Sequence, residues 1–133
     1  MIFLFKNQQT NKTFIIILFS QSLMAKSILL SGFDAFNNKK ENNSQVIAKL
    51  IKKEFEGTDI TVEYCQLRTV YNKSSDTLKD CFHSLKEKPD FVISIGEGFC
   101  DRISFETMAF NEMNSKTPDN DGVVYRRASI DQN

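Results

Sequence analysis

The sequence predicts an α/β fold with a mainly parallel sheet and helices packed against it. After Met24, short apolar runs alternate with stretches of helical periodicity, in the order strand, helix, strand, helix, strand. Glycine-containing turns follow the first and the last of these strands. Because ligands bind at the carboxyl ends of the strands in open sheets of this kind, we expect functional residues beside these two turns.

The composition is that of one small globular domain. The chain has 133 residues, of which 41% are hydrophobic, and its twelve phenylalanines supply material for a core. Lys plus Arg and Asp plus Glu number 17 each, so the formal net charge is zero. Because the molecule has no strong overall field, we expect neither nucleic acid nor a membrane as a partner.

Residues 1–23 differ from the rest of the chain because they contain two lysines, no acidic residue and one apolar run of six residues, Phe14 to Phe19. This run is short for a signal-peptide core and cannot span a bilayer, which takes about 20 residues. We interpret residues 1–23 as an N-terminal extension, either the product of a start mis-assigned upstream of Met24 or a disordered tail, with a weak export signal as the alternative. Residues 24–133 then form the domain.

The first two elements of this domain are a strand and a helix. Ser27 to Ser31 is a short strand that stops at Gly32. Ser44 is a good N-cap residue, and apolar residues recur after it at helical spacing until Gly57 supplies a stop. These apolar residues are Ile47, Leu50, Ile51 and Phe55.

A second strand, a second helix and a third strand follow. Residues 60–64 alternate between apolar and polar, as in a half-buried strand. The helix carries one apolar stripe and ends before Pro89. The stripe consists of Leu78, Cys81, Phe82 and Leu85. Phe91 to Ile95 is nearly all apolar and ends at Gly96, which predicts a central strand buried on both faces.

The pattern changes beyond Gly98. Ile103 to Phe110 predicts a further strand, and the polar stretch Thr117 to Gly122 contains a Pro-Asp-Asn-Asp-Gly sequence with strong turn chemistry. Residues 123–133 show no closing element. A three-stranded parallel sheet with such a tail is a poor finished domain, so we expect an incomplete domain.

Glu106 is the first candidate site residue. Strand alternation places it on the same face as Met108 and Phe110, and an acid on an apolar face must be paired, hydrogen-bonded or protonated. Such positions are candidates for function. The alternative is an acid of an edge strand that faces water.

The cysteines and the single histidine offer few routes to a catalytic nucleophile. Cys65, Cys81 and Cys100 are widely spaced and lack C-x-x-C pairing, which favours reduced thiols in a cytoplasm over zinc or a redox pair. Cys81 lies on the apolar stripe, whereas His83 lies beside it and faces solvent. Cys100 follows the last glycine turn beside Asp101, an unfavourable neighbour for a thiolate. We predict no metal and no cofactor.

Three segments, in order, carry a resemblance to a known family. The first is Ser31 to Phe36, with Asn42-Asn43-Ser44 downstream, and the second is Gly96 to Asn111, which joins a glycine turn to Ile-Ser-Phe-Glu-Thr-Met-Ala-Phe-Asn. The third is Lys116 to Gly122, Lys-Thr-Pro-Asp-Asn-Asp-Gly. Over Lys26 to about Gly122, the chain resembles the pyrrolidone-carboxylate peptidases, also called pyroglutamyl peptidase I, of cysteine peptidase family C15.

The resemblance implies a three-layer α/β/α sandwich and a cytoplasmic thiol hydrolase that removes N-terminal pyroglutamate from peptides with a Cys–His–Glu triad. Glu106 matches the acidic member of the triad, which orients the histidine. Phe33 and Phe36 match aromatic residues that enclose the apolar faces of the pyrrolidone ring. Asn42 matches a polar contact to that ring.

Several positions depart from the family pattern. They lie in and after the first segment, in the glycine turn, directly after Glu106 and at the start of the third segment. They are Ala35, Asn37, Asn38, Asn43, Glu97, Thr107 and Lys116. The family's nucleophilic cysteine and its histidine follow the Pro-Asp-Asn turn at positions beyond Asn133, and neither the cysteines of this chain nor His83 match them.

Two functions therefore stay open from the sequence. One is part of a pyroglutamyl peptidase that is inactive alone, and the other is a non-catalytic C15-like module for binding or assembly. The expected partners are a peptide with N-terminal pyroglutamate once the enzyme is completed, and either a homo-oligomer or a complementing C-terminal chain at the open sheet edge.

Overall fold

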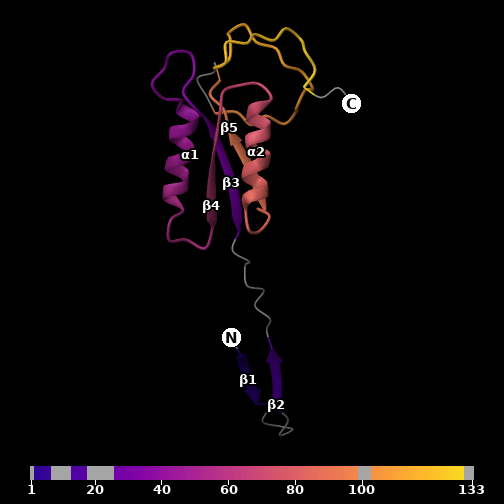
Figure 1. The fold of residues 1–133 in the computed structure, drawn as a ribbon. Coiled ribbons are helices and arrows are strands. Elements are labelled where there is room, and N and C mark those ends of the chain that lie inside the picture. The colour runs from indigo at the N-terminus through magenta and orange to yellow at the C-terminus, as the bar shows by residue number, and fades with distance from the viewer. Residues whose placement is uncertain (1, 7–12, 18–25, 99–102, 131–133) are drawn as a thin grey trace.

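The computed structural model of the chain describes residues 2–6, 13–17, 26–98 and 103–130 (Figure 1). Its elements are β1 (Ile2–Lys6), β2 (Thr13–Ile17), β3 (Ser27–Phe33), α1 (Asn43–Glu54), β4 (Thr61–Leu67), α2 (Lys73–Ser84) and β5 (Phe91–Ile95). β3, β4 and β5 form a parallel sheet in the order β4-β3-β5, while β1 and β2 pair with each other in a separate antiparallel sheet. The predicted alternation of strands and helices is confirmed. None of the helices in these ranges is long and apolar enough to cross a bilayer.

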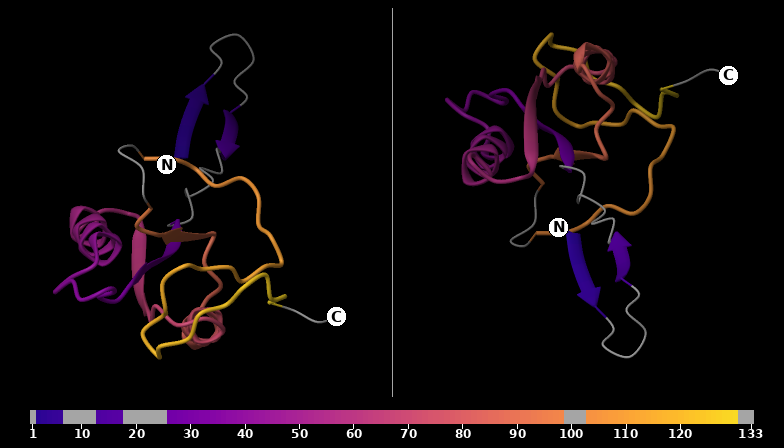
Figure 2. Two further views of the ribbon diagram at one scale, coloured as in Figure 1. Left: turned by 90° about the horizontal axis from the view of Figure 1, so that it is seen from above. Right: turned by 90° about the horizontal axis from the view of Figure 1, so that it is seen from below.

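Neighbouring residues of β3 divide the core between the two faces of the sheet. Leu29 is buried with Cys65 on the face that α2 covers, and Leu30 is buried with Ala48 of α1 on the opposite face. This division follows from strand geometry, in which successive side chains point to opposite faces. Figures 1 and 2 show the resulting three layers, with the sheet between the two helices. The α/β sandwich is therefore confirmed.

Helix α1 begins two residues earlier than predicted and buries only part of its apolar surface. Its N-cap is Asn42, and the predicted cap Ser44 is instead buried inside the first turn. Of the predicted core positions, Ile51 packs on the sheet, but Ile47 and Leu50 are exposed. The buried stripe is therefore narrower than the hydrophobic pattern predicts.

Helix α2 packs its predicted stripe against the cluster formed by β3 and β4, which confirms that prediction. The prediction of reduced thiols is wrong for two of the three cysteines, because Cys65 of β4 and Cys81 of α2 form a disulfide with a Cα–Cα distance of 6.1 Å. Packing of the stripe on the strand brings the two residues within the range that a disulfide requires. Cys100 lies outside the described residues.

Strand β5 is exposed on both faces, so its predicted burial is wrong. Phe91, Val92 and Ile93 are 55%, 47% and 45% exposed. The reason is position, because β5 is at the edge of the sheet and β3 is the strand with a neighbour on each side. The apolar run correctly predicted a strand, but it did not predict which elements would cover that strand.

Residues 103–110 form neither a helix nor the predicted strand. Their large apolar side chains are exposed, with Phe105 at 92%. Farther along the chain, Met113 and Ala128 form an isolated antiparallel bridge with N–O distances of 2.6 and 3.0 Å. The Tyr125 ring then meets the Tyr71 ring edge-on at 4.9 Å, which places residues 113–128 beside the carboxyl end of β4.

Candidate functional site

The candidate site lies at the carboxyl edge of the sheet, where β3 passes into α1. Gly32 is needed there because a Cβ at this position would lie 2.6 Å from the Ser44 carbonyl oxygen. This close approach places the start of α1 directly over the end of β3. The Ser44 hydroxyl accepts a hydrogen bond from the Phe33 amide at 3.0 Å, which fixes the last residue of the strand.

Asn42 organises the loop between these two elements and is buried. Its Oδ1 accepts from the amide and the hydroxyl of Ser44, at 3.0 and 2.7 Å, and its Nδ2 donates to the Asp34 carbonyl oxygen at 3.0 Å. Through Ser44, these contacts link Asn42 to Phe33. An amide nitrogen has two hydrogens, and the bond to Asp34 uses one of those of Asn42.

The two predicted aromatic residues stand at either end of the 33–36 segment. Phe33 is half-buried and packs on the cluster of Leu29, Cys65 and Leu67. Phe36 is also half-buried, and its carbonyl oxygen accepts a hydrogen bond from the Lys39 amide at 3.2 Å, which closes a turn.

Asp34 connects three segments of the chain, and this role was not predicted from the sequence. Its Oδ1 accepts from the Thr69 amide at 2.7 Å and from Asn120 Nδ2 at 3.0 Å. The same Asn120 nitrogen donates to the Ala35 carbonyl oxygen at 2.8 Å, and the Asn120 amide donates to the Thr69 carbonyl oxygen at 2.9 Å. Three segments remote in sequence, around residues 34, 69 and 120, are thereby joined at one edge.

The turn that contains Asn120 is held by the buried carboxylate of Asp119. Its Oδ1 accepts from the amides of Asp121 and Val123, at 3.0 and 2.9 Å, and its Oδ2 accepts from the Tyr71 amide at 3.2 Å. Gly122 completes the turn at a φ of +82°, in the left-handed region that glycine favours. The Pro-Asp-Asn-Asp-Gly sequence was correctly predicted to be a turn. The same sequence could have indicated that this turn contacts the edge of the sheet.

Glu97 lies in the second glycine turn, after β5, and bonds to residues at the carboxyl edge of the sheet. The sequence predicted that this turn would lie at that edge. Glu97 forms an ion pair with Lys39 and accepts from the Asn43 amide at 3.1 Å. The hydrogen bond from Lys39, followed by that from Asn43, lowers the pKa of the Glu97 carboxyl from its ordinary value. Glu97 thus occupies the N-terminus of α1, where a negative charge is favoured.

Asp121 connects the same turn to neighbouring residues through two ion pairs. It pairs with Lys73 at the start of α2 and with Arg68, whose Nη2 lies 3.1 Å from its Oδ1. Lys73, with a smaller contribution from Arg68, lowers the pKa of the Asp121 carboxyl.

Glu106 does not lie on an apolar strand face as predicted. It is exposed and belongs to segment 103–110, which forms no helix or strand. Within the described residues, the structure joins it to none of Phe33, Phe36 and Asn42 by a hydrogen bond or an ion pair. The predicted site residues are therefore divided into an assembled group at the β3–α1 loop and a separate acid.

The cysteines and His83 do not form a nucleophile with its base in the described part of the chain. Cys65 and Cys81 are joined in the disulfide, and His83 is exposed, as predicted, with its ring against Phe82. No group of three or more His, Cys, Asp or Glu side chains that could hold a metal ion occurs among residues 2–6, 13–17, 26–98 and 103–130.

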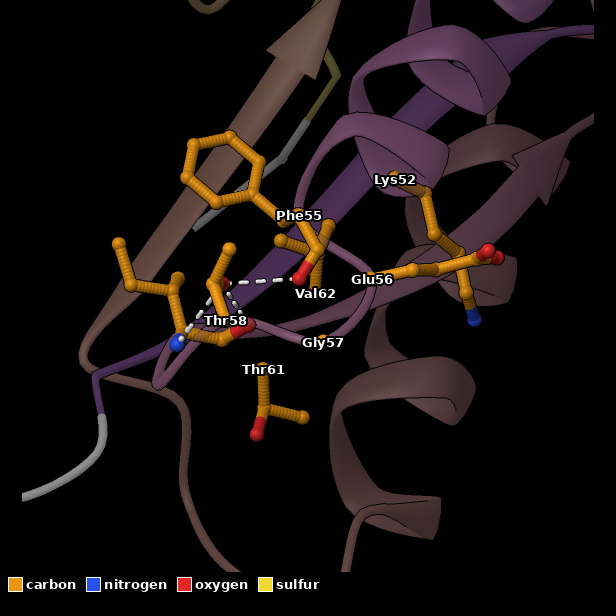
Figure 3. A pocket seen from close by; sticks show the side chains of 8 residues that line it. Lys52, Phe55, Glu56, Gly57, Thr58, Thr61 and Val62 are labelled. Carbon is orange, nitrogen blue, oxygen red and sulfur yellow. Dashed lines mark hydrogen bonds between the residues drawn. The ribbon is translucent and has the colours of Figure 1, made fainter.

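A surface hollow at the opposite end of the sheet is not a comparable site (Figure 3). It lies where α1 passes into β4, and its lining includes Phe55, Gly57, Thr58 and Val62. The Thr58 hydroxyl donates to the Phe55 carbonyl oxygen at 2.8 Å and accepts from the Ile60 amide at 3.2 Å. This hydroxyl stabilises the turn itself.

Comparisons with known proteins agree with one another. The model of the family described as pyroglutamyl peptidase, peptidase C15, matches residues 26–133. The pyrrolidone-carboxylate peptidase of Bacillus subtilis is 37% identical over 100 residues, which are 74% of this chain and 45% of that protein. That of Lactobacillus johnsonii is 34% identical over 96 residues, 71% of this chain and 43% of that protein.

Solved structures give the same result for the fold. The pyroglutamyl peptidase I of Bacillus amyloliquefaciens superimposes with a TM-score of 0.73 at 30% identity, over 82% of this chain and 51% of that chain. A mutant pyrrolidone carboxyl peptidase of Pyrococcus furiosus superimposes with a TM-score of 0.69 at 29% identity, over 80% of this chain and 50% of that chain. The chain thus spans about half the length of the relatives it matches.

Proposed function

Because this chain belongs to the pyroglutamyl peptidase family, peptidase C15, we propose that it supplies the N-terminal half of a thiol hydrolase that removes pyroglutamate from the amino terminus of peptides. The observation that carries the proposal is the set of hydrogen bonds that Asp34 and Asn120 form at the carboxyl edge of the sheet. These bonds hold the segment between Phe33 and Phe36 where ligands bind in such sheets.

In this proposal, the β3–α1 loop binds the pyrrolidone ring. The ring is flat and neutral, so it requires apolar walls and a few placed hydrogen bonds rather than a counter-charge. Phe33 and Phe36 supply the walls, and Asn42 supplies its remaining amide hydrogen. The other polar atoms of Asn42 hold the loop in place and cap α1.

Glu106 is the acid that orients a histidine in this proposal. Its exposure is consistent with a partner group that the described residues do not provide. The nucleophilic thiolate and the histidine base come from the other half of the family domain, because Cys65 and Cys81 are bonded to each other. Triad members act as a unit, so we expect the chain alone to be inactive.

Hydrolysis of a chromogenic pyroglutamyl amide tests this function. We expect no turnover by the chain alone, and turnover when it is mixed with a polypeptide containing the C-terminal half of the Bacillus subtilis relative. Glu106→Gln should abolish that turnover, and Glu112→Gln, at another exposed glutamate nearby, should not. Turnover by the chain alone that Glu106→Gln abolishes would contradict the proposed inactivity.

A second candidate function is a non-catalytic C15-like module for binding or assembly, and the exposure of β5 favours it. Size exclusion and circular dichroism distinguish the two, because a stable, folded monomer that never activates with the complementary half supports the module.

We also propose a cytoplasmic location. The family resemblance supports this location, in which the Cys65–Cys81 disulfide would be an exception because the cytosol keeps most thiols reduced. Cell fractionation, with the chain detected by mass spectrometry, tests the location.

A further inference from the structure

The two edges of the three-stranded sheet differ in how they are protected. On β4, the exposed side chains are polar and engaged, since Glu63 pairs with Lys52 at 3.2 Å and Gln66 accepts from Gln45 at 2.8 Å. α1 and α2 both pack against this strand. Polar, covered edges of this kind resist pairing with another strand.

The β5 edge is less protected within the described residues, where Ile95 alone of this strand packs on the cluster beneath α1. The register pairs Leu29 with Val92 and Leu30 with Ile93, so Val92 lies on the face of α2 and Ile93 on the face of α1. Both are exposed, because α1 packs mainly on β3 and β4 and α2 packs on β4. Figure 2 shows the orange segment that includes residues 103–110 as a wide loop away from the sheet.

This loop carries further exposed apolar side chains. Its segment 103–110 exposes four large apolar side chains and carries one acid, Glu106. The apolar residues are Ile103, Phe105, Met108 and Phe110. β5 and segment 103–110 each expose large apolar side chains suited to burial, and exposed apolar surfaces of this kind mark interaction sites.

We infer that the outer edge and both faces of β5, with segment 103–110, are the docking surface for a polypeptide equivalent to the remaining half of a pyroglutamyl peptidase domain. The inference rests on the proposed function and deepens it by placing the partner. The occupant follows from length, because the solved relative with a TM-score of 0.73 carries about as much chain again beyond the matched 51%. It adds a parallel strand to β5 by main-chain hydrogen bonds and covers Phe91 and Val92 with apolar side chains.

A binding experiment with a matched pair of variants tests the surface. The full chain is mixed with the C-terminal half of the Bacillus subtilis relative, and complex formation is measured by size exclusion and native mass spectrometry. We expect a 1:1 complex that Phe91→Glu weakens at least tenfold. Leu50→Glu should leave the complex unchanged, although Leu50 of α1 and Phe91 are each 55% exposed.

Hydrogen exchange on the unaltered chain gives a second readout that does not depend on a variant folding. Binding should slow exchange of the amides of residues 91–95 and leave those of β4 unchanged. No complex, a complex lost with Leu50→Glu but not with Phe91→Glu, or a self-dimer of this chain through β5 would each overturn the inference. A complex that protects β5 but hydrolyses no pyroglutamyl amide would support the docking surface and defeat the proposed function alone.

Discussion

At the scale of single residues, Asn120 joins the last of the predicted motifs to the loop after β3. Its side-chain nitrogen bonds to both Asp34 and the Ala35 carbonyl oxygen. Asn120→Ala removes both bonds, so we expect the free energy of unfolding to fall by about 1–2 kcal/mol. Urea titration followed by circular dichroism measures the change. Asn114→Ala, at another exposed asparagine of the same region, is the control, and equal midpoints for the two variants would contradict the assignment.

Glu97 makes the stability of the site depend on pH. Its folded-state pKa is held below the ordinary value of 4.5 by Lys39 and the Asn43 amide. A lowered carboxyl pKa contributes stability that is fully present above the unfolded-state pKa and is lost as the pH falls through the folded-state value. The melting temperature of the wild type minus that of Glu97→Gln should therefore be constant from pH 7 to about 5 and shrink below 4.5. A difference that stays constant down to pH 3 would exclude this role.

At the scale of elements, the contact between β3 and α1 depends on the absence of a side chain at position 32. Gly32→Ala places a carbon 2.6 Å from a backbone oxygen of Ser44, so strand and helix must move apart. We expect a loss of about 1–3 kcal/mol in the free energy of unfolding, as for other overpacked sites. Gly96→Ala is a matched control because its Cβ would meet nothing within 4 Å. Comparable urea midpoints for both variants would show that the contact is looser than described.

The disulfide ties α2 to the sheet in addition to its apolar stripe. Cys65 and Cys81 are 16 residues apart, and closing a loop of about 15 residues stabilises the folded state by about 3 kcal/mol in the chain-entropy model. We expect the urea midpoint to fall on reduction with a phosphine. The same fall should occur in Cys100→Ser, which retains the pair. Two free thiols at positions 65 and 81 before reduction would refute the pairing.

These elements also show why sequence periodicity predicts some packing and not the rest. The stripe of α2 was predicted correctly because a single apolar face leaves one way to pack. For β5, the apolar run reports what the strand is suited to, whereas its exposure depends on which elements lie beside it. The disulfide was missed because two cysteines in different elements meet only once the helix packs on the strand.

At the scale of the whole molecule, the fold class and one edge of the sheet could be predicted from the sequence, and the connections across that edge could not. The alternation of elements leads directly to a parallel sheet, and Gly32 and Gly96 indicate the functional edge. The bonds of Asp34 to Thr69 and Asn120 depend on how two loops approach each other in space. Glu106 was identified from strand alternation and then from its motif, and the predicted strand is not formed because segment 103–110 pairs with no strand in the described part of the chain.

The bonds of Asn120 also affect the order in which the molecule comes apart. They join residues 85 and 86 positions apart, so their formation closes a very long loop at a high entropic cost. The parallel sheet is held by a buried core to which Asn120 does not belong. We therefore expect segment 113–128 to form late in folding and to detach before the sheet unfolds, which would uncover the carboxyl edge of the sheet.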